Sequence, residues 1–160
     1  MKRSNTQTRS PKVFPDITAE LLEGGHSICF QAPGRSMHPT IRDGETITVE
    51  PVTPSGVKVG DILLYRGKTG VIAHRVVQIE RENTHAVTGS SSLSPDYLFI
   101  LRGDASVNCD FPVEQAQVLG KVVSVQRAGR SIDLYTWRAK IGRIAHSCAS
   151  RLKRRIIRLA

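Results

Sequence analysis

The stretch ILLYRGKTGVIAHRVVQI, residues 62–79, decides the fold of this chain. Dense apolar runs at 62–65 and 71–79 flank a connector at 66–70 that contains two glycines. Apolar runs of this length, with β-branched residues, are typical of buried strands, and a short glycine-containing connector between two of them favours a hairpin. The sequence therefore predicts two buried antiparallel strands here.

Shorter strands are predicted on both sides of this hairpin. Apolar residues alternate with polar ones at residues 28–32 and 47–49, which is the period of a strand with one buried face. Residues 118–125 form another strong strand pattern, and residues 127–130 are typical of a second hairpin turn. Strands at this spacing indicate a mostly β fold, a compact antiparallel β-barrel-like domain.

A short helix is expected at the start of this domain. Asp16 is positioned to cap it, and the pair Gly24 and Gly25 would end it by supplying left-handed backbone angles. The preceding residues 1–15 are polar, basic and interrupted by proline, so we expect them to be flexible. The β domain is then expected to span residues 16–134.

The last segment, residues 135–160, has a different composition. Residues 1–126 hold 13 Lys and Arg against 13 Asp and Glu, whereas residues 127–160 hold 10 against 1. From Trp137 to Leu159, apolar residues share one helical face and basic residues the other, which predicts a basic amphipathic helix. This helix would either pack on the domain or a second subunit, or make peripheral contact with an anionic membrane. Because the body is neutral and holds few aromatic residues, no nucleic-acid partner is expected.

The cysteines and the hydropathy of the chain bear on its expected cofactors and cellular location. The three cysteines, Cys29, Cys109 and Cys148, are odd in number and far apart, so neither a disulfide framework nor a zinc site is expected. We expect no metal and no organic cofactor. The chain has no export signal and no apolar run near the roughly 20 residues that span a bilayer. The expected location is cytoplasmic, or peripheral at the cytoplasmic membrane.

Ser36 is the candidate nucleophile. It lies between Gly34 and Pro39, directly after the strand predicted at 28–32. A rigid loop of this kind can present the serine Oγ beside backbone N–H groups, including that of Ser36, which could form an oxyanion hole. A serine in such a loop is also typical of a plain turn. A catalytic role for Ser36 therefore requires a base nearby.

His74 is the candidate base, because it stands in a strand otherwise made of apolar residues and one arginine. A buried imidazole costs free energy unless it is hydrogen-bonded, so it calls for a partner. Asp104 and Asp110 lie six residues apart around a turn, and a carboxylate on the other imidazole N–H would orient the ring and stabilise the imidazolium. A structural histidine and two solvated turn acids remain the alternative interpretation.

These motifs, in this order and spacing, resemble those of the signal peptidase I family over roughly residues 26–125. The motifs are Ser36-Met37-x-Pro39-Thr40, Gly60-Asp61-Ile62, His74-Arg75-Val76-Val77, Gly103-Asp104 with Asp110 behind it, and Val118-Leu119-Gly120-Lys121-Val122. The match is to the histidine branch of the endoplasmic reticulum and archaea. The resemblance implies a serine endopeptidase that processes signal peptides, with a LexA-like β fold.

The resemblance also implies roles for individual residues. His74 would deprotonate Ser36, which attacks a peptide carbonyl to form an acyl-enzyme. The acid that completes the site in this branch corresponds to Asp110, which we therefore rank above Asp104. The family cleaves after small apolar residues. The substrate is expected to bind as a strand, in contact with Ile28, Phe30, Ala32 and Met37.

The chain departs from the family at several positions. We expect the chain to lack the family's membrane-spanning N-terminal segment. Gly34 stands where some members carry a hydroxyl residue aimed at the oxyanion, so only backbone N–H groups such as that of Ser36 are expected to serve. Arg35 replaces the usual small residue beside the nucleophile, which indicates a changed substrate preference.

Two other functions fit parts of the pattern. A LexA-like self-cleaving domain shares the Ser-Met-x-Pro loop but uses a lysine base, and the nearest lysine, Lys68, lies in the preceding turn. A non-catalytic module could keep the fold and bind peptide or membrane. Retention of Ser36, His74 and two acids at compatible positions favours the peptidase over both.

Overall fold

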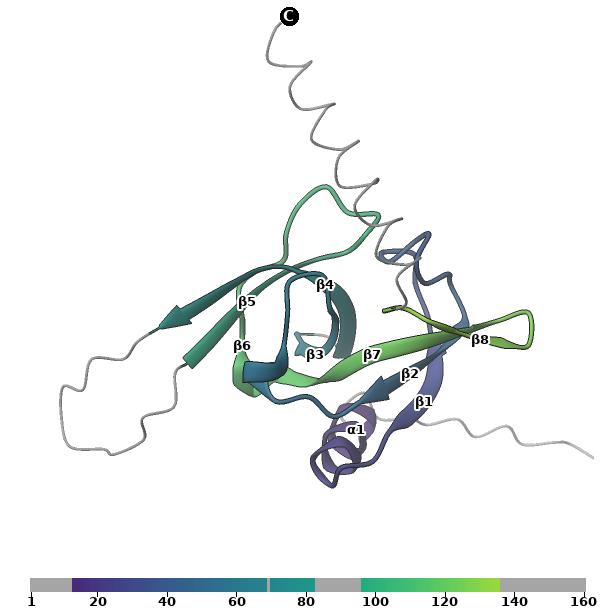
Figure 1. Ribbon diagram of the computed structural model, residues 1–160, viewed down its shortest axis with the longest axis horizontal. Helices are drawn as coiled ribbons and strands as arrows, with labels where there is room; N and C mark the ends of the chain where they lie inside the picture. The colour runs from purple at the N-terminus through teal and green to yellow at the C-terminus, as the bar shows by residue number, and fades with distance from the viewer. Residues whose placement is uncertain (1–12, 69, 83–95, 136–160) are drawn as a thin grey trace, which may run out of the picture.

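The computed structural model describes residues 13–68, 70–82 and 96–135, and this part of the chain forms a single antiparallel sheet with one α-helix (Figure 1). The helix is α1 (Val13–Glu23), and two short 3-10 helices are η1 (Pro54–Gly56) and η2 (Gln115–Gln117). The strands are β1 (Ile28–Ala32), β2 (Glu45–Glu50), β3 (Ile62–Gly67), β4 (Gly70–Glu82), β5 (Asp96–Arg102), β6 (Val113–Glu114), β7 (Val118–Arg127) and β8 (Arg130–Asp133). All of the predicted basic amphipathic helix at 135–160 except Tyr135, and most of the segment 1–15, lie outside the described residues.

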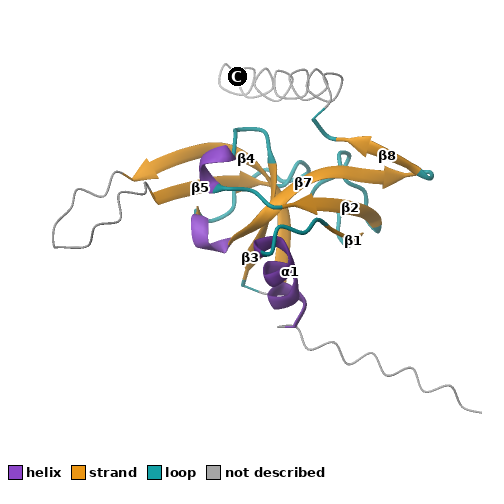
Figure 2. Ribbon diagram, turned by 60° about the horizontal axis from the view of Figure 1, so that its bottom comes forward, coloured by secondary structure: helices purple, strands orange, loops and turns teal. Residues whose placement is uncertain are grey.

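The strands follow the order β1-β2-β7-β3-β4-β5-β6, with β8 added beside β7. Every adjacent pair is antiparallel. The β4–β5 ribbon projects from one end and the β7–β8 hairpin from the other (Figure 2). The prediction of a mostly β, antiparallel fold is confirmed. The prediction of a barrel-like closure is wrong, because β1 and β6, which end the path, do not pair with each other.

The β3–β4 hairpin lies at the centre of the sheet, as its sequence predicts. Its register pairs Leu63 with His74 and Gly67 with Gly70. Alternate residues of β3 contribute to two apolar clusters, with Ile62 and Leu64 in the first, and Leu63 and Tyr65 in the second. Burial on both faces explains why this strand is a continuous apolar run instead of an alternating one.

Helix α1 begins earlier than the sequence predicts. It starts at Val13, so Asp16 lies inside the first turn instead of capping the helix, and its carboxylate accepts a hydrogen bond of 2.6 Å from Arg66. The C-terminus ends as predicted, because Gly25 adopts a φ of 83° and its N–H donates to the Leu22 carbonyl. None of the helices in the described ranges has the length and apolar character needed to cross a membrane.

An ion pair beside the first core cluster gives the fold a pH-dependent contribution. Arg127 donates hydrogen bonds of 2.5 and 2.9 Å to the Glu45 carboxylate and a further one to the Thr40 carbonyl. The Arg127 guanidinium lowers the pKa of Glu45 below its ordinary value, chiefly through this side-chain hydrogen bond. The folded state therefore favours the ionised carboxylate.

We expect Glu45→Gln to lower the free energy of unfolding by about 1 kcal/mol near pH 7. A depressed carboxyl pKa contributes stability above the unfolded value of about 4.3, and this contribution is lost as the pH falls through the folded pKa. Urea unfolding should show the gap between the two proteins shrinking below about pH 4. Glu50→Gln, at the exposed end of β2, is the control, and a gap that is constant with pH would contradict the assignment.

Candidate active site

The Ser36 loop follows β1 directly and is fixed at both ends. Gly34, with a φ of 106°, takes a backbone conformation that favours glycine, and its N–H donates a hydrogen bond of 2.8 Å to Asp43. The Ser36 carbonyl accepts a hydrogen bond of 2.8 Å from the N–H of Ala105. The loop is therefore tied to the segment that follows β5, which carries the two candidate acids.

His74 lies in β4 and meets the serine. Its Nε2 is 2.9 Å from Ser36 Oγ, and the residue is only 7% exposed. The β3–β4 register places it opposite Leu63, so its ring occupies the second cluster's face of the sheet. The hydrogen-bond partner that the buried imidazole requires is therefore the Ser36 hydroxyl on one side of the ring.

Asp110 lies on the other side of the imidazole. Its Oδ2 is 2.5 Å from His74 Nδ1, and its backbone N–H donates to the Leu101 carbonyl at 2.8 Å. The structure thus joins Ser36, His74 and Asp110 in a continuous chain of hydrogen bonds. With a carboxylate on Nδ1, the imidazole keeps its proton on that nitrogen and leaves Nε2 free to accept the serine proton.

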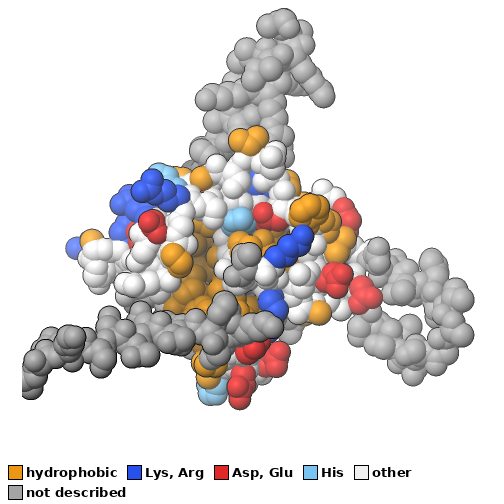
Figure 3. Space-filling model, turned by 180° about the vertical axis from the view of Figure 1, so that it is seen from behind, with side chains coloured by type: hydrophobic (Ala, Val, Ile, Leu, Met, Phe, Trp, Pro, Cys, Tyr) orange, Lys and Arg blue, Asp and Glu red, His pale blue; other side chains and the backbone are white. Residues whose placement is uncertain are grey.

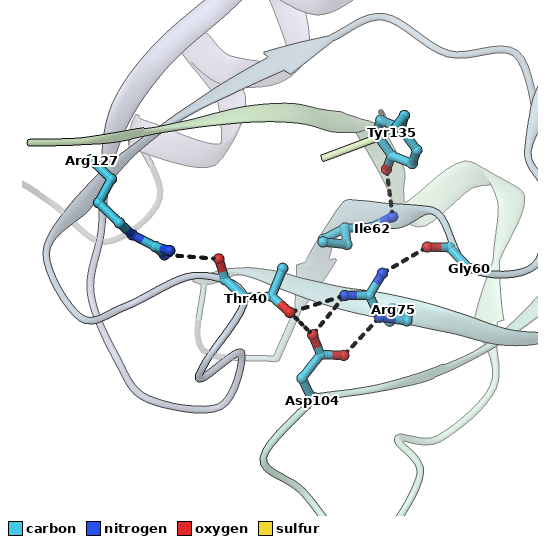
Figure 4. Close-up of polar contacts among 7 residues, drawn as sticks. All are labelled: Thr40, Gly60, Ile62, Arg75, Asp104, Arg127 and Tyr135. Atoms are coloured by element: carbon cyan, nitrogen blue, oxygen red, sulfur yellow. Dashed lines mark hydrogen bonds and ion pairs between the residues drawn. The ribbon is translucent and has the colours of Figure 1, made fainter. Parts of the chain in front are cut away.

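Asp104, the other candidate acid, has a different set of partners (Figure 4). Its two carboxylate oxygens accept hydrogen bonds of 2.7 and 2.6 Å from Arg75, and Thr40 Oγ1 donates to it at 2.5 Å. Arg75 also donates to the Gly60 carbonyl at 2.8 Å. Asp104 therefore connects the Ser36 loop to β4, and among the described residues its carboxylate makes no hydrogen bond to His74.

Tyr65 belongs to the site, although the sequence analysis did not identify it. Its hydroxyl donates a hydrogen bond of 3.1 Å to Asp110 Oδ2, the oxygen that also contacts His74. Burial first, and then the nearby Asp110 carboxylate, raise the pKa of Tyr65, so the phenol stays protonated. A tyrosine in an apolar strand is most simply predicted to be a core residue. Only its position two residues from Leu63, the strand partner of His74, could have indicated that Tyr65 lies near the histidine.

Gly103 allows the parts of the site to approach each other. A Cβ at this position would lie 2.6 Å from the Ser36 carbonyl oxygen, 2.8 Å from Ser106 Oγ and 3.1 Å from His74 Nε2. Separations below about 3 Å do not occur between such atoms without movement of one of them. Glycine is required here by close approach to the nucleophile loop and the base.

If Ser36 and His74 act together in catalysis, Gly103→Ala is expected to lower the rate by about a hundredfold, because a displacement of about 1 Å at a catalytic group costs roughly that factor. The substitution should also lower the melting temperature, since a backbone oxygen must move. Gly56→Ala is the matched control, because its Cβ would meet only Thr53 Oγ1 at 3.2 Å, in η1. Activity of Gly103→Ala equal to that of the control would contradict this role.

An apolar cavity of about 600 Å³ opens beside Ser36. Its lining includes Ser36 and three of the predicted substrate contacts, Phe30, Ala32 and Met37. Figure 3 shows apolar side chains gathered on one face of the molecule. The cavity's other side is formed by Leu64 of β3 and by residues 71–73 of β4.

Ile28, the fourth predicted substrate contact, does not line this cavity. It lies at the opposite end of β1 from Ala32, paired with Val49, and packs against the first apolar cluster. At about 3.3 Å per residue, four residues separate it from the nucleophile end of the strand by roughly 13 Å. Its role as a substrate contact therefore stays a prediction, since alternation identifies a face of a strand and not a position along it.

The backbone N–H of Ser36 is the group predicted to bind the oxyanion. Among residues 13–68, 70–82 and 96–135, it donates no hydrogen bond. A donor left free beside the nucleophile is available to a ligand oxygen. Over the same ranges, no group of three or more His, Cys, Asp or Glu side chains is arranged to hold a metal ion.

Comparison with known proteins adds no assignment to this geometry. No protein-family model matches the chain, and no curated protein matches it either.

Proposed function

We propose that this chain is a serine peptidase in which Ser36 is the nucleophile, His74 the general base and Asp110 the residue that orients the base. The observation that supports it most is the imidazole of His74, with Nε2 at 2.9 Å from Ser36 Oγ and Nδ1 at 2.5 Å from Asp110. A serine hydroxyl becomes a useful nucleophile only beside such a base.

The proposed reaction begins with proton transfer from Ser36 Oγ to His74 Nε2 while Oγ bonds to the peptide carbonyl carbon. The imidazolium, stabilised by Asp110, then gives that proton to the departing amine as the C–N bond breaks, which leaves an ester on Ser36. Water attacks the ester and gives one proton to His74, which returns it to Ser36 Oγ as the carboxylic acid product leaves.

The oxyanion that forms in both steps needs donors. The N–H of Ser36, which donates no hydrogen bond to any described residue, is the candidate donor, because it belongs to the residue that forms the bond to the carbonyl carbon. The loop that carries it is held by Gly34 and by the Ala105 hydrogen bond, so little reorganisation is needed when charge develops.

The substrate is proposed to bind as an extended strand between β1 and the first residues of β4. β1 pairs only with β2, and β5 pairs with β4 from Arg75 onward, so both facing edges keep free backbone groups in the described part of the sheet. A peptide can add to such an edge by main-chain hydrogen bonds, with alternate side chains in the apolar cavity. The sheet's incomplete closure supports this mode of binding.

The motif order supports a relation to the histidine branch of the signal peptidase I family. In that interpretation the chain cleaves precursor-like peptides after small apolar residues. Ser36-Met37 and Gly103-Asp104 then occupy the positions that the family's motifs have relative to the base. The lysine-dependent self-cleaving alternative lacks comparable support, because the ammonium of Lys68 lies over the ring of Phe111, 5.4 Å from its centroid.

Digestion of a diverse peptide library by the purified chain tests the proposed function. Mass spectrometry of the new termini is expected to show cleavage that favours apolar residues before the cut, because the cavity beside Ser36 is apolar. Chain unfolded by urea should produce no new termini. A folded, monodisperse chain that generates none would reject peptidase activity.

A further inference from the structure

The geometry points to Tyr65 as a positioning residue for the base: its hydroxyl fixes the Asp110 carboxylate in the orientation that holds His74. This inference deepens the proposed peptidase function and rests on it. Within the described residues, the Tyr65 hydroxyl makes no hydrogen bond to Ser36, and Tyr65 does not line the cavity beside that serine. The effect of this hydroxyl on the base would therefore pass through Asp110.

Both hydrogen bonds of the Asp110 side chain involve one atom, Oδ2. Oδ2 accepts from Tyr65 at 3.1 Å and contacts His74 Nδ1 at 2.5 Å, while the backbone N–H of Asp110 donates to Leu101. Asp110 lies in the loop between β5 and β6, and its side chain is 26% exposed. A partly exposed carboxylate on a loop needs a second anchor to keep one rotamer, and the Tyr65 hydroxyl is that anchor.

The strand pairing makes Tyr65 a rigid anchor. It is 5% exposed, and it pairs with Ile72 of β4 and Val118 of β7. Because Leu63 is the partner of His74, Tyr65 lies diagonally across from the histidine on the same face, with ring centroids 6.3 Å apart. His74 and Tyr65 therefore both belong to the central β3–β4 hairpin. Asp110 lies outside this hairpin and is hydrogen-bonded to both of them.

The phenol can serve only as a donor here. Burial and the negative charge of Asp110 both raise the pKa of Tyr65, so the hydroxyl keeps its proton. Donation to a carboxylate favours the ionised acid, the form that stabilises an imidazolium. A phenylalanine would preserve the ring and its packing but remove this donor.

Tyr65→Phe tests the inference, with Tyr97→Phe as the matched loss of a tyrosine hydroxyl. Tyr97 stacks on Phe99 in β5, with ring centroids 6.2 Å apart. We expect Tyr65→Phe to lower the rate of Ser36 acylation by a serine-directed acylating probe about tenfold, the value of one hydrogen bond to a charged group. The downfield proton resonance of His74 Nδ1–H, assigned by its loss in His74→Ala, should shift or broaden in Tyr65→Phe. Tyr97→Phe should change neither rate nor resonance.

A second comparison shows whether Tyr65 acts through Asp110. In an Asp110→Asn background, adding Tyr65→Phe should slow acylation no further, because residues that act as one unit are not additive. An unchanged Nδ1–H resonance in Tyr65→Phe, or a further tenfold loss in the double variant, would overturn the inference. Failure of the wild-type chain to react at Ser36 would instead reject the proposed function, and the resonance would still report on Tyr65.

Discussion

Ser36→Ala is expected to reduce peptide hydrolysis to the uncatalysed background, a loss of at least about ten-thousandfold. The covalent route requires an oxygen at this position, and its Oγ is the only serine hydroxyl that the structure's described residues place on His74 Nε2, at 2.9 Å. The measurement is the rate of cleavage of the best library peptide. Loss of one exposed hydroxyl should leave the melting temperature within a few degrees of wild type.

Ser131→Ala, on the exposed strand β8, is the control for loss of a serine hydroxyl and should cleave at the wild-type rate. Residual turnover in Ser36→Ala above that of the unfolded chain would show that another group carries the reaction. In that case the hydrogen bond between Ser36 and His74 would be structural.

His74→Ala is expected to lower the same rate at least about a thousandfold. Without the imidazole, no described side chain is positioned to accept the serine proton, and the Asp110 carboxylate loses its Nδ1 partner. The two substitutions should be strongly non-additive, because Ser36 and His74 act in one proton transfer. The double variant is therefore expected to be no slower than Ser36→Ala alone.

His26→Ala, directly after α1 and exposed, is the control for this second prediction. Its activity should equal that of the wild type. A His74→Ala variant that keeps its fold and more than about a tenth of wild-type activity would contradict the role of general base.

The positions of the strands could be predicted because hydrophobic periodicity is local. The run at 62–65 is apolar at every residue because β3 is buried on both faces, and residues 28–32 alternate because β1 buries one. His74 could be singled out for a related reason. An imidazole among apolar residues of a strand is unfavourable without a partner, so its presence in the sequence already indicated a hydrogen bond.

The closure of the sheet could not be predicted in this way. Alternation and turn residues report which residues form strands, and they are the same in an open sheet and a barrel. In the described part of the sheet, β1 and the first part of β4 do not pair with each other, and residues of both line one cavity. The start of α1 could not be predicted either, because helix boundaries are uncertain by a few residues and the capping side chain of Asp16 lies inside the first turn.

The roles of the two acids depend on the path of a loop. Asp104 and Asp110 are both polar residues of one turn, and nothing in their spacing shows which faces the histidine. The hydrogen bonds from Ala105 N–H to Ser36 and from Asp110 N–H to Leu101 determine that path. They bring Asp110 to His74 and leave Asp104 to Arg75.

Tyr65 and Gly103 were missed because their importance comes from distant partners. Tyr65 lies 45 residues from Asp110 in the chain, and its strand explains its presence as core packing. Gly103 has no left-handed φ to explain it and is needed only because the Ser36 carbonyl and His74 come within reach of its missing Cβ. Such requirements arise only when the chain is folded.

The most direct test of the catalytic assignment is the site of reaction of a serine-directed acylating probe with the native wild-type chain, mapped by tandem mass spectrometry. The predicted result is a single adduct on the Ser36 hydroxyl, because His74 activates that serine and no other described one. An unmodified chain, or an adduct on a different serine such as Ser106, would contradict it.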